Sequence, residues 1–408
     1  MSARRFFTIL LACSVLLTCA VGCARPGMRA GECFRKAPAA MSGWTFFGDC
    51  AQAKAENLAA AKTCLAIDGC GYAESPKRPV DASRAYHIRG WGRTEGDIQN
   101  NACLKIKWYD ANEEVIYWEF VRRNFFTRDW REYEKVCVAP AGASYVSAVC
   151  HAQAMWGKKS YFTAVSITPV EPPPLRFDMR FDRIEEEWFN DRSPYRNDGE
   201  AFCLKNEDII VSQDGGAANF ANRKAKVRLY HSQSLAISSD EWVMVAQFFP
   251  EEPPTEAPEQ AHFTLIDCED YYLQYRKEKD KAGKTTLKLV LLFRGTDEQG
   301  KSAYTFTAMP VELFKWYRLT IKVNKPAGRF ETELLVDGDE MIKRAGRLPA
   351  QVQVRCPIFY VGCKDYPRAG RRPWPWGLWG RMDYIKIYDS FAAHEADRDN
   401  LRYGGFGK

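Results

Sequence analysis

The chain has 408 residues, a formal net charge of +6, and a composition that is 46% hydrophobic, 13% aromatic and 27% charged. This length suggests about two or three domains, and the hydrophobic fraction excludes wholesale disorder. The excess of positive charge is small and evenly spread, which excludes a dedicated nucleic-acid binder. The high aromatic content favours β-structure and also suits surfaces that stack on sugars.

Residues 1–23 are typical of an export signal rather than of a fold. Two arginines precede an apolar run over residues 6–17, which is too short to span a bilayer. The next segment, Ala20-Val21-Gly22-Cys23, resembles the lipobox of bacterial lipoproteins, although Ala20 stands where that motif usually has Leu. We predict an exported protein that is lipid-anchored to the cell envelope through Cys23; simple cleavage and secretion is the alternative.

The 14 cysteines are too sparse for a disulfide-built scaffold. No Cys-x-x-Cys occurs and no histidine lies at zinc-like spacing from a cysteine pair, so a zinc site is not expected. Cys64 and Cys70 are a candidate pair for one disulfide. Cys103 lies in a strand pattern and is interpreted as a small buried hydrophobe.

The segment after the signal divides into a predicted tether over residues 24–40 and a region of short alternating segments over residues 41–170. Alternation over 104–109 predicts a half-buried strand, and a polar stretch separates it from a second strand over 115–121. Together they predict a hairpin, whose second strand places Trp118 on one face. One Ala-rich stretch, 51–61, is compatible with a helix.

A proline-rich linker over residues 171–176 is the clearest boundary, because three successive prolines form a stiff, extended spacer. Short strand-like runs recur over residues 177–392, and Asp337-Gly338 between two of them predicts a tight hairpin turn. Residues 393–408 are polar and Gly-rich, which predicts a loose tail.

The C-terminal half resembles the laminin-G-like, concanavalin-A-like jelly rolls over residues 177–392. The segments that carry this resemblance occur in the family's order: 191–199 (DRSPYRNDG), 316–319 (WYRL), 336–338 (VDG), 360–362 (YVG) and 379–388 (WGRMDYIKIY). The resemblance implies a jelly-roll fold and leaves the ligand open. It also implies that Trp379 lies in the core.

The N-terminal half resembles a carbohydrate-binding module of the galactose-binding-like β-sandwich type. The supporting segments are 86–91 (YHIRGW), 129–131 (DWR), 139–143 (APAGA) and 161–167 (YFTAVSI). The family usually has one or two Asp in its last strand, often serving a structural calcium, but Thr163 and Ala164 stand there in this chain. The fold class predicted for the whole chain is therefore all-β, with two tandem β-sandwiches.

The most unusual local sequence is Arg371-Arg372-Pro373-Trp374-Pro375-Trp376. Prolines on both sides of Trp374 argue against a central strand, so Trp374 and Trp376 are predicted in a loop. We predict that they contact a ligand together with Arg371 and Arg372; packing over the sandwich edge is the alternative. Trp118 and Trp156 are weaker candidates for a binding platform, whereas Trp91, Trp108 and Trp130 are predicted in the core.

Two sets of acidic residues suggest other chemistry. Asp267 and Glu269 lie two apart on a predicted strand, a separation within the range of glycoside hydrolases, although the three-acid strand of hydrolases with this fold is not completed. Asp191 and Asp383 lie in segments that the jelly-roll family brings together, but they supply too few oxygens to commit to calcium. We predict no cofactor and leave the metal open.

The sequence therefore predicts a non-catalytic, exported carbohydrate-binding or cell-surface attachment protein. Its partner would be a polysaccharide or other glycan, it would reach a membrane only through the lipid anchor, and it would not bind nucleic acid. The alternatives are a polysaccharide-degrading enzyme on the jelly roll and a structural surface protein that binds other proteins.

Overall fold

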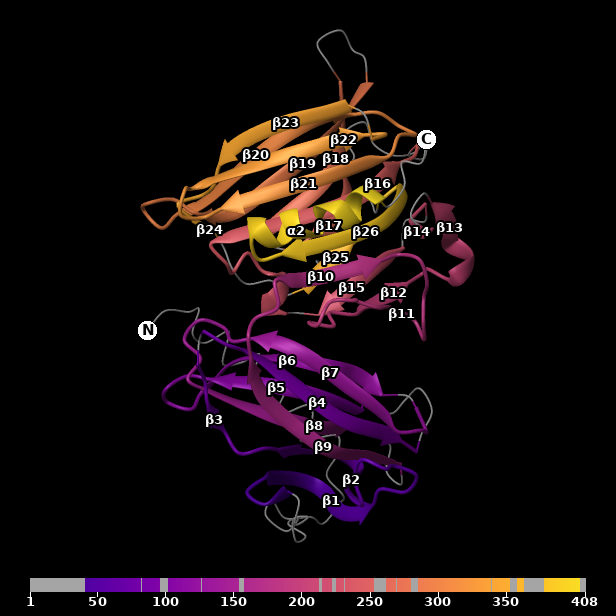
Figure 1. Ribbon diagram of the computed structural model, residues 1–408, viewed down its shortest axis with the longest axis vertical. Helices are drawn as coiled ribbons and strands as arrows, with labels where there is room; N and C mark the ends of the chain where they lie inside the picture. Colours follow the sequence, from indigo (N-terminus) through magenta and orange to yellow (C-terminus); the bar gives the residue numbers. More distant parts are fainter. Residues whose placement is uncertain are drawn as a thin grey trace, which may run out of the picture. The chain divides into compact units, whose positions relative to one another are not determined.

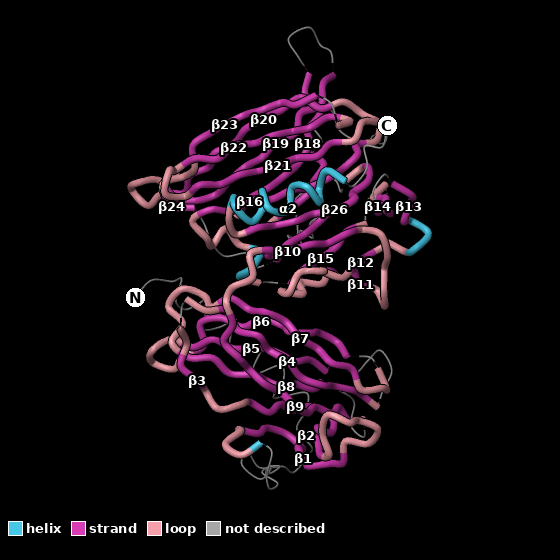
Figure 2. The backbone as a smooth tube through the Cα atoms, viewed as in Figure 1, coloured by secondary structure: helices cyan, strands magenta, loops and turns pink. Residues whose placement is uncertain are grey.

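The computed structural model describes residues 41–81, 83–95, 102–125, 127–153, 158–212, 215–221, 225–230, 232–252, 262–268, 270–279, 285–338, 340–352, 358–362 and 378–403. These residues form two compact units, of which the first comprises residues 41–81, 88–134 and 142–168 and the second comprises the remainder. Strands dominate both units, which confirms the predicted all-β class (Figures 1 and 2).

The first sheet has nine strands in the order β6-β5-β8-β2-β9-β4-β7, with β1 added to β2 and β3 added to β8. Its strands are β1 (Thr45–Lys54), β2 (Thr63–Glu74), β3 (Arg78–Pro79), β4 (Ala85–Thr94), β5 (Ala102–Tyr109), β6 (Val115–Phe125), β7 (Arg131–Val138), β8 (Tyr145–Gln153) and β9 (Lys159–Val170). The hairpin predicted over 104–121 is confirmed as the antiparallel pair β5–β6.

Strand β2 belongs to two parts of this sheet. Its first half pairs with β9 and its second half pairs with β8, and the change of partner falls at Gly69, which has a φ of 70°. Opposite this point, Gly48 of β1 has a φ of 88°, and a Cβ there would lie 2.5 Å from the carbonyl oxygen of Cys70. Glycine is required at position 48, and the resulting bulge lets β1 follow the bend of β2.

The helix that the Ala-rich stretch 51–61 suggested does not form. Residues up to Lys54 continue β1, with Ala53 opposite Cys64 and Lys54 opposite Thr63. The local helix propensity of alanine is outweighed here by pairing along the whole of β2. The candidate disulfide between Cys64 and Cys70 does not form, since both are free thiols. They lie six residues apart along the same strand, which is too far for a disulfide.

The second unit is a sandwich of two sheets. The second sheet has the order β13-β14-β26-β16-β21-β22-β23 with β10 added to β26, and its strands are β10 (Leu175–Arg180), β13 (Ile209–Ser212), β14 (Gly215–Asn219), β16 (Glu241–Pro250), β21 (Tyr317–Asn324), β22 (Arg329–Val336), β23 (Glu340–Arg347) and β26 (Gly380–Tyr388). The predicted turn between β22 and β23 is confirmed, since Asp337 and Gly338 both have positive φ, 46° and 89°.

The third sheet has the order β11-β12-β15-β25-β17-β18-β19-β20 with β24 added to β19. Its strands are β11 (Trp188–Phe189), β12 (Gly199–Phe202), β15 (Lys226–Tyr230), β17 (His262–Asp267), β18 (Tyr271–Lys279), β19 (Thr285–Thr296), β20 (Ser302–Val311), β24 (Gln351–Val352) and β25 (Ile358–Val361). One continuous core joins the inner faces of the second and third sheets, with Trp242, Phe293 and Phe359 among its buried rings.

The end of the described chain is a helix rather than the predicted loose tail. Helix α2 (Phe391–Tyr403) lies across β16 and β26, on the face of the second sheet that points away from the core (Figure 1). Phe391 and Ala393 pack there against a cluster that includes Val243 and Tyr388. An apolar patch on the sheet therefore fixes a segment whose composition alone indicated disorder. Two short 3-10 helices, Asn206–Asp208 and Gln233–Leu235, complete the described elements.

Candidate functional site

One face of the first sheet gathers aromatic and charged side chains from five adjacent strands. We call it the β6–β1 face and define it by ten residues: Phe47, Tyr72, Glu74, Lys105, Lys107, Tyr109, Trp118, Phe120, Ser147 and His151. The strand register places them side by side: Lys107 is opposite both Trp118 and Ser147, and Tyr72 is opposite both His151 and Phe47. The opposite face of β5 carries Ile106 and Trp108, both fully buried. Over residues 104–108, buried side chains on one face of β5 therefore alternate with half-buried lysines on the other.

A hydrogen-bonded polar group occupies the middle of this face. The Lys107 ammonium donates to Glu74 Oε2 at 2.8 Å, and the Ser147 hydroxyl donates to Glu74 Oε1 at 2.7 Å. The Tyr109 hydroxyl also donates to Glu74 Oε1 and lies 3.3 Å from the Ser147 hydroxyl. Both carboxylate oxygens of Glu74 are thus held in place, and a lysine ammonium with three donors is fixed beside them.

Aromatic rings flank this polar centre on both sides. On β6, Trp118 is 37% exposed and its ring meets that of Phe120 edge-on, with centroids 5.2 Å apart. On β1, Phe47 is 55% exposed and stacks on Tyr72 with centroids 5.5 Å apart. Lys105 places its ammonium 5.2 Å from the Trp118 ring centroid, so a cation borders the ring surface.

His151 contributes a neutral ring to the same face. Its Nδ1 lies 3.5 Å from the Cys103 sulfur. Burial, together with the positive charges of Lys105 and Lys107, lowers the pKa of His151 to about 3. The imidazole is therefore uncharged at neutral pH, and the charges of the face come from its lysines and Glu74.

The residues predicted to bind the ligand are not among those the structure describes. The segment 363–377 is outside the described residues, and it contains Trp374, Trp376, Arg371 and Arg372. Cys23 is also outside the described residues, in the segment 1–40. Their predicted roles stay predictions. Of the candidate acidic pair, Asp267 is buried at the end of β17, whereas Glu269 lies outside the described residues.

The two acids considered for calcium have other roles. Asp191 accepts hydrogen bonds from the backbone N–H groups of Asp178, Ser193 and Asn197 at 2.7–2.9 Å, and from the Ser193 hydroxyl at 2.9 Å. Burial raises the pKa of Asp191 to about 6, against the effect of these donors. Because N–H donors occupy both carboxylate oxygens, Asp191 does not fit a calcium ligand. Asp383 instead accepts from Ser212 at 2.8 Å and Gln247 at 3.2 Å.

The tryptophans predicted in the core divide into two groups. Trp108 is fully buried, as predicted, whereas Trp379 is partly buried and packs against the core of the second unit. Trp91 and Trp130 are only half-buried, and they line a hollow of about 460 Å³ together with the segment 56–60. Trp91 lies within β4, and Trp130 immediately precedes β7.

Sequence reasoning found only part of the β6–β1 face. It named Trp118 as a weak candidate for a binding platform. It also predicted a half-buried strand over 104–109, in which Lys105, Lys107 and Tyr109 share the face opposite the apolar residues. It missed Tyr72 and Glu74, which lie about 30 residues before β5 and reach the face because β8 pairs with both β2 and β5. The sequence pattern of a single strand does not indicate which strands pair with it.

No family model matches the chain, and no curated protein matches it. Among solved structures, the N-terminal tandem of CBM22 domains from Paenibacillus barcinonensis Xyn10C is 11% identical, covers 85% of this chain and 93% of its own length, and has a TM-score of 0.25. The alginate lyase from Aplysia kurodai is 9% identical over 46% of this chain and 89% of its own, with a TM-score of 0.26. The tailspike protein 4 domain of bacteriophage CBA120 is 11% identical with a TM-score of 0.27, and the match spans 32% of this chain and 20% of the tailspike chain. At these scores, none of the three indicates what this chain binds.

Proposed function

We propose that the protein is a non-catalytic carbohydrate-binding protein that holds a glycan on the β6–β1 face. The observation that carries this proposal is the arrangement of aromatic rings around a fixed polar centre. The exposed Trp118 and the half-buried Phe120 lie on one side, the exposed Phe47 and the half-buried Tyr72 on the other, and the Lys107–Glu74 pair between them. Sugars present both apolar C–H faces and hydroxyls, and this surface offers partners for both.

The chemistry of the face favours a sugar over a purely apolar ligand. Rings that are 37% and 55% exposed provide flat apolar surface without forming a closed pocket. The ammonium of Lys107 uses one of its three donors on Glu74, so donors remain for ligand hydroxyls. Because Glu74 already holds this ammonium and is itself held by the Ser147 hydroxyl, little side-chain entropy is lost when a ligand binds.

The dimensions of the face favour an oligosaccharide over a single sugar. Trp118 and Phe47 lie on strands that are four pairings apart, β6-β5-β8-β2-β1. At the usual strand spacing of about 4.8 Å, four pairings amount to about 19 Å. A chain of several sugar units, lying across the strands, would contact both pairs of rings.

The test is a glycan array with the full chain, followed by titration calorimetry with the best oligosaccharide. We expect Trp118→Ala to weaken binding by about tenfold or more, since it removes a stacking ring. Trp130→Ala is the matched control, because Trp130 lines the separate 460 Å³ hollow of the same unit. Loss of binding in Trp130→Ala with full binding in Trp118→Ala would place the glycan in that hollow and reject the proposal.

We further propose that the protein is exported and anchored by lipid on Cys23. The signal-like composition of residues 1–23 supports this. Among the described residues, no helix has the length and apolar character needed to cross a bilayer. Membrane fractionation would compare wild type with Cys23→Ser. We expect wild type in the membrane fraction and Cys23→Ser in the soluble fraction, and the same distribution for both would contradict the anchor.

A further inference from the structure

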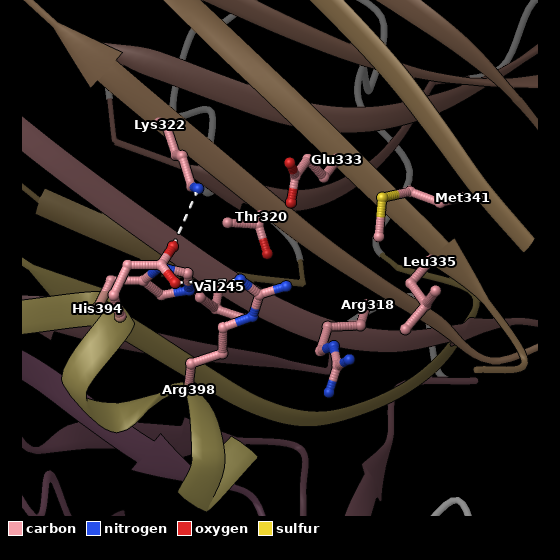
Figure 3. A pocket seen from close by; sticks show the side chains of 10 residues that line it. Val245, Arg318, Thr320, Lys322, Glu333, Leu335, Met341, His394 and Arg398 are labelled. Carbon is pink, nitrogen blue, oxygen red and sulfur yellow. Dashed lines mark hydrogen bonds and ion pairs between the residues drawn. The ribbon is translucent and has the colours of Figure 1, made fainter. Parts of the chain in front are cut away.

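A small cleft in the second unit lies between helix α2 and strands β21 and β22 (Figure 3). It has a volume of about 70 Å³, which admits one small chemical group rather than a sugar ring. Its polar lining comes from three elements: Arg318, Thr320 and Lys322 on β21, Glu333 on β22, and His394, Glu395 and Arg398 on α2. The cleft is distinct from the β6–β1 face, because no residue is shared between them.

Helix α2 is fixed firmly enough to form one wall of this cleft. The buried ammonium of Lys386 on β26 pairs with Asp397 at 2.8 Å, and the Tyr388 hydroxyl donates to the same carboxylate. At the start of the helix, the Phe391 N–H donates to the Glu241 carboxylate at 2.9 Å. These contacts are independent of the cleft residues, so the wall does not depend on what the cleft holds.

The lining carries more positive than negative charge. Arg318, Lys322 and Arg398 supply three cations, and Glu333 and Glu395 supply two carboxylates. Lys322 pairs with Glu395 at 3.3 Å and Arg398 pairs with it at 3.1 Å, while Glu333 is paired from outside the cleft by Lys343 at 3.3 Å. The lining itself therefore carries one more cation than carboxylates, and Lys322 and Arg398 share a single carboxylate between them.

His394 adds an unsatisfied polar atom to the same place. Its side chain is buried, with 7% of its surface exposed, and its Nδ1 makes no hydrogen bond. The carboxylate oxygen Oε1 of Glu395 is 3.5 Å from this nitrogen. Burial lowers the pKa of His394, and the positive charges of Lys322 and Arg398 lower it as well. The negative charges of Glu395 and Glu333 have the opposite, smaller effect. A buried polar atom without a partner favours a ligand that supplies one.

The remaining wall is apolar. Val245, Leu335 and Met341 line it, and Met341 is 45% exposed at the rim. A ligand that fits must therefore combine a compact anion with an adjoining apolar surface. A sugar acid has this combination, because its ring carries C–H groups directly beside the carboxylate.

We propose that this cleft binds a single anionic substituent, a carboxylate or a sulfate, carried by an acidic sugar. The inference rests on the proposed function only in taking the ligand to be a saccharide. The anion is held between Arg318 and Arg398 with the Thr320 hydroxyl beside them, while the neighbouring ring carbons rest on Leu335 and Met341.

The test is titration calorimetry of the full chain with digalacturonate, with its methyl ester, and with a 6-sulfated neutral disaccharide. The ester keeps the shape of the ligand and removes its charge. We expect measurable affinity for digalacturonate, at least about tenfold weaker binding of the ester, and an affinity that falls as salt rises. Binding of the sulfated sugar in place of digalacturonate identifies sulfate as the anion recognised.

Variants locate the binding. Arg398→Gln should weaken binding of the charged sugar by about tenfold, because it removes one charge-assisted hydrogen bond. Arg347→Gln on β23 removes the same charge from an exposed position that does not line the cleft, and it should have no effect. Thr320→Val tests the hydroxyl with no change of charge and should weaken binding to a smaller extent.

Three results would overturn the inference: equal affinity for acid and ester, equal effects of Arg398→Gln and Arg347→Gln, or loss of acidic-sugar binding in Trp118→Ala. The last result would move the acidic sugar to the β6–β1 face and leave the proposed function intact. Conversely, if Trp118→Ala binds neutral glycans as well as wild type and Arg398→Gln loses the acidic sugar, the proposed function fails and the cleft stands.

Discussion

The two units each present a sheet face away from their core, and these faces differ in what covers them. The β6–β1 face carries exposed rings of Trp118 and Phe47 around a neutralised polar pair. The corresponding face of the second sheet carries Val243, Val245 and Tyr388, which are buried because helix α2 packs over them. A helix supplied by the chain itself thus covers apolar side chains in the second unit.

This difference bears on function. Large apolar side chains on the surface of one sheet are stabilised by burial, and in the second unit the chain buries them itself. On the β6–β1 face, rings of similar size stay exposed beside prearranged polar groups. Exposed aromatic residues of that kind favour a ligand-binding role.

The largest effect we expect comes from Trp108, which lies on the core side of the strand pair that carries Trp118. Trp108→Ala should lower the free energy of unfolding by about 3–5 kcal/mol, because a fully buried indole is replaced by a cavity. Trp118→Ala should lower it by less than about 1 kcal/mol. Urea unfolding of both variants tests this, and equal losses would show that Trp118 is a packing residue.

A second prediction concerns pH. The pKa of His151 is lowered to about 3 in the folded chain from its ordinary value of 6.5, so between these values the unfolded state binds more protons. This group therefore stabilises the fold above pH 6.5, and its contribution falls by about 5 kcal/mol in total as the pH drops toward 3. His151→Gln removes the titration, so its unfolding free energy should depend less on pH than that of wild type. Parallel pH dependences would contradict the burial of this ring.

A third prediction concerns the attachment of helix α2. Asp397→Asn should lower the free energy of unfolding by about 1.5–3 kcal/mol, because it leaves the buried Lys386 ammonium without its charged partner. Glu395→Gln on the same helix should cost less than about 1 kcal/mol, since its partners are more exposed. If both variants are equally stable, the helix is not held by the Lys386 pair.

A small effect on stability is expected at Lys107. Lys107→Met should change the free energy of unfolding by less than about 1 kcal/mol, because Glu74 keeps its hydrogen bonds from Tyr109 and Ser147. The same variant should weaken glycan binding by about tenfold, since a charged donor is lost. Paired chemical-denaturation and calorimetric measurements test this, and unchanged affinity would remove Lys107 from the site.

The sequence allowed the strands and several turns to be predicted, because alternation and turn residues are local signals. The hairpin β5–β6 and the turn at Asp337-Gly338 are examples. The partners of a strand are not local, so the meeting of Tyr72 with His151 could not be predicted. Helix α2 was missed for the same reason: its polar composition gave no sign of the apolar patch on the second sheet that it covers.

The central claim is that the glycan lies on the β6–β1 face rather than on the proline-flanked tryptophans of the second half. Titration calorimetry with one neutral oligosaccharide would compare wild type, Trp118→Ala and the double variant Trp374→Ala/Trp376→Ala. The account predicts that binding falls by about tenfold or more in Trp118→Ala and is unchanged in the double variant. Full binding by Trp118→Ala together with loss of binding in the double variant would contradict it.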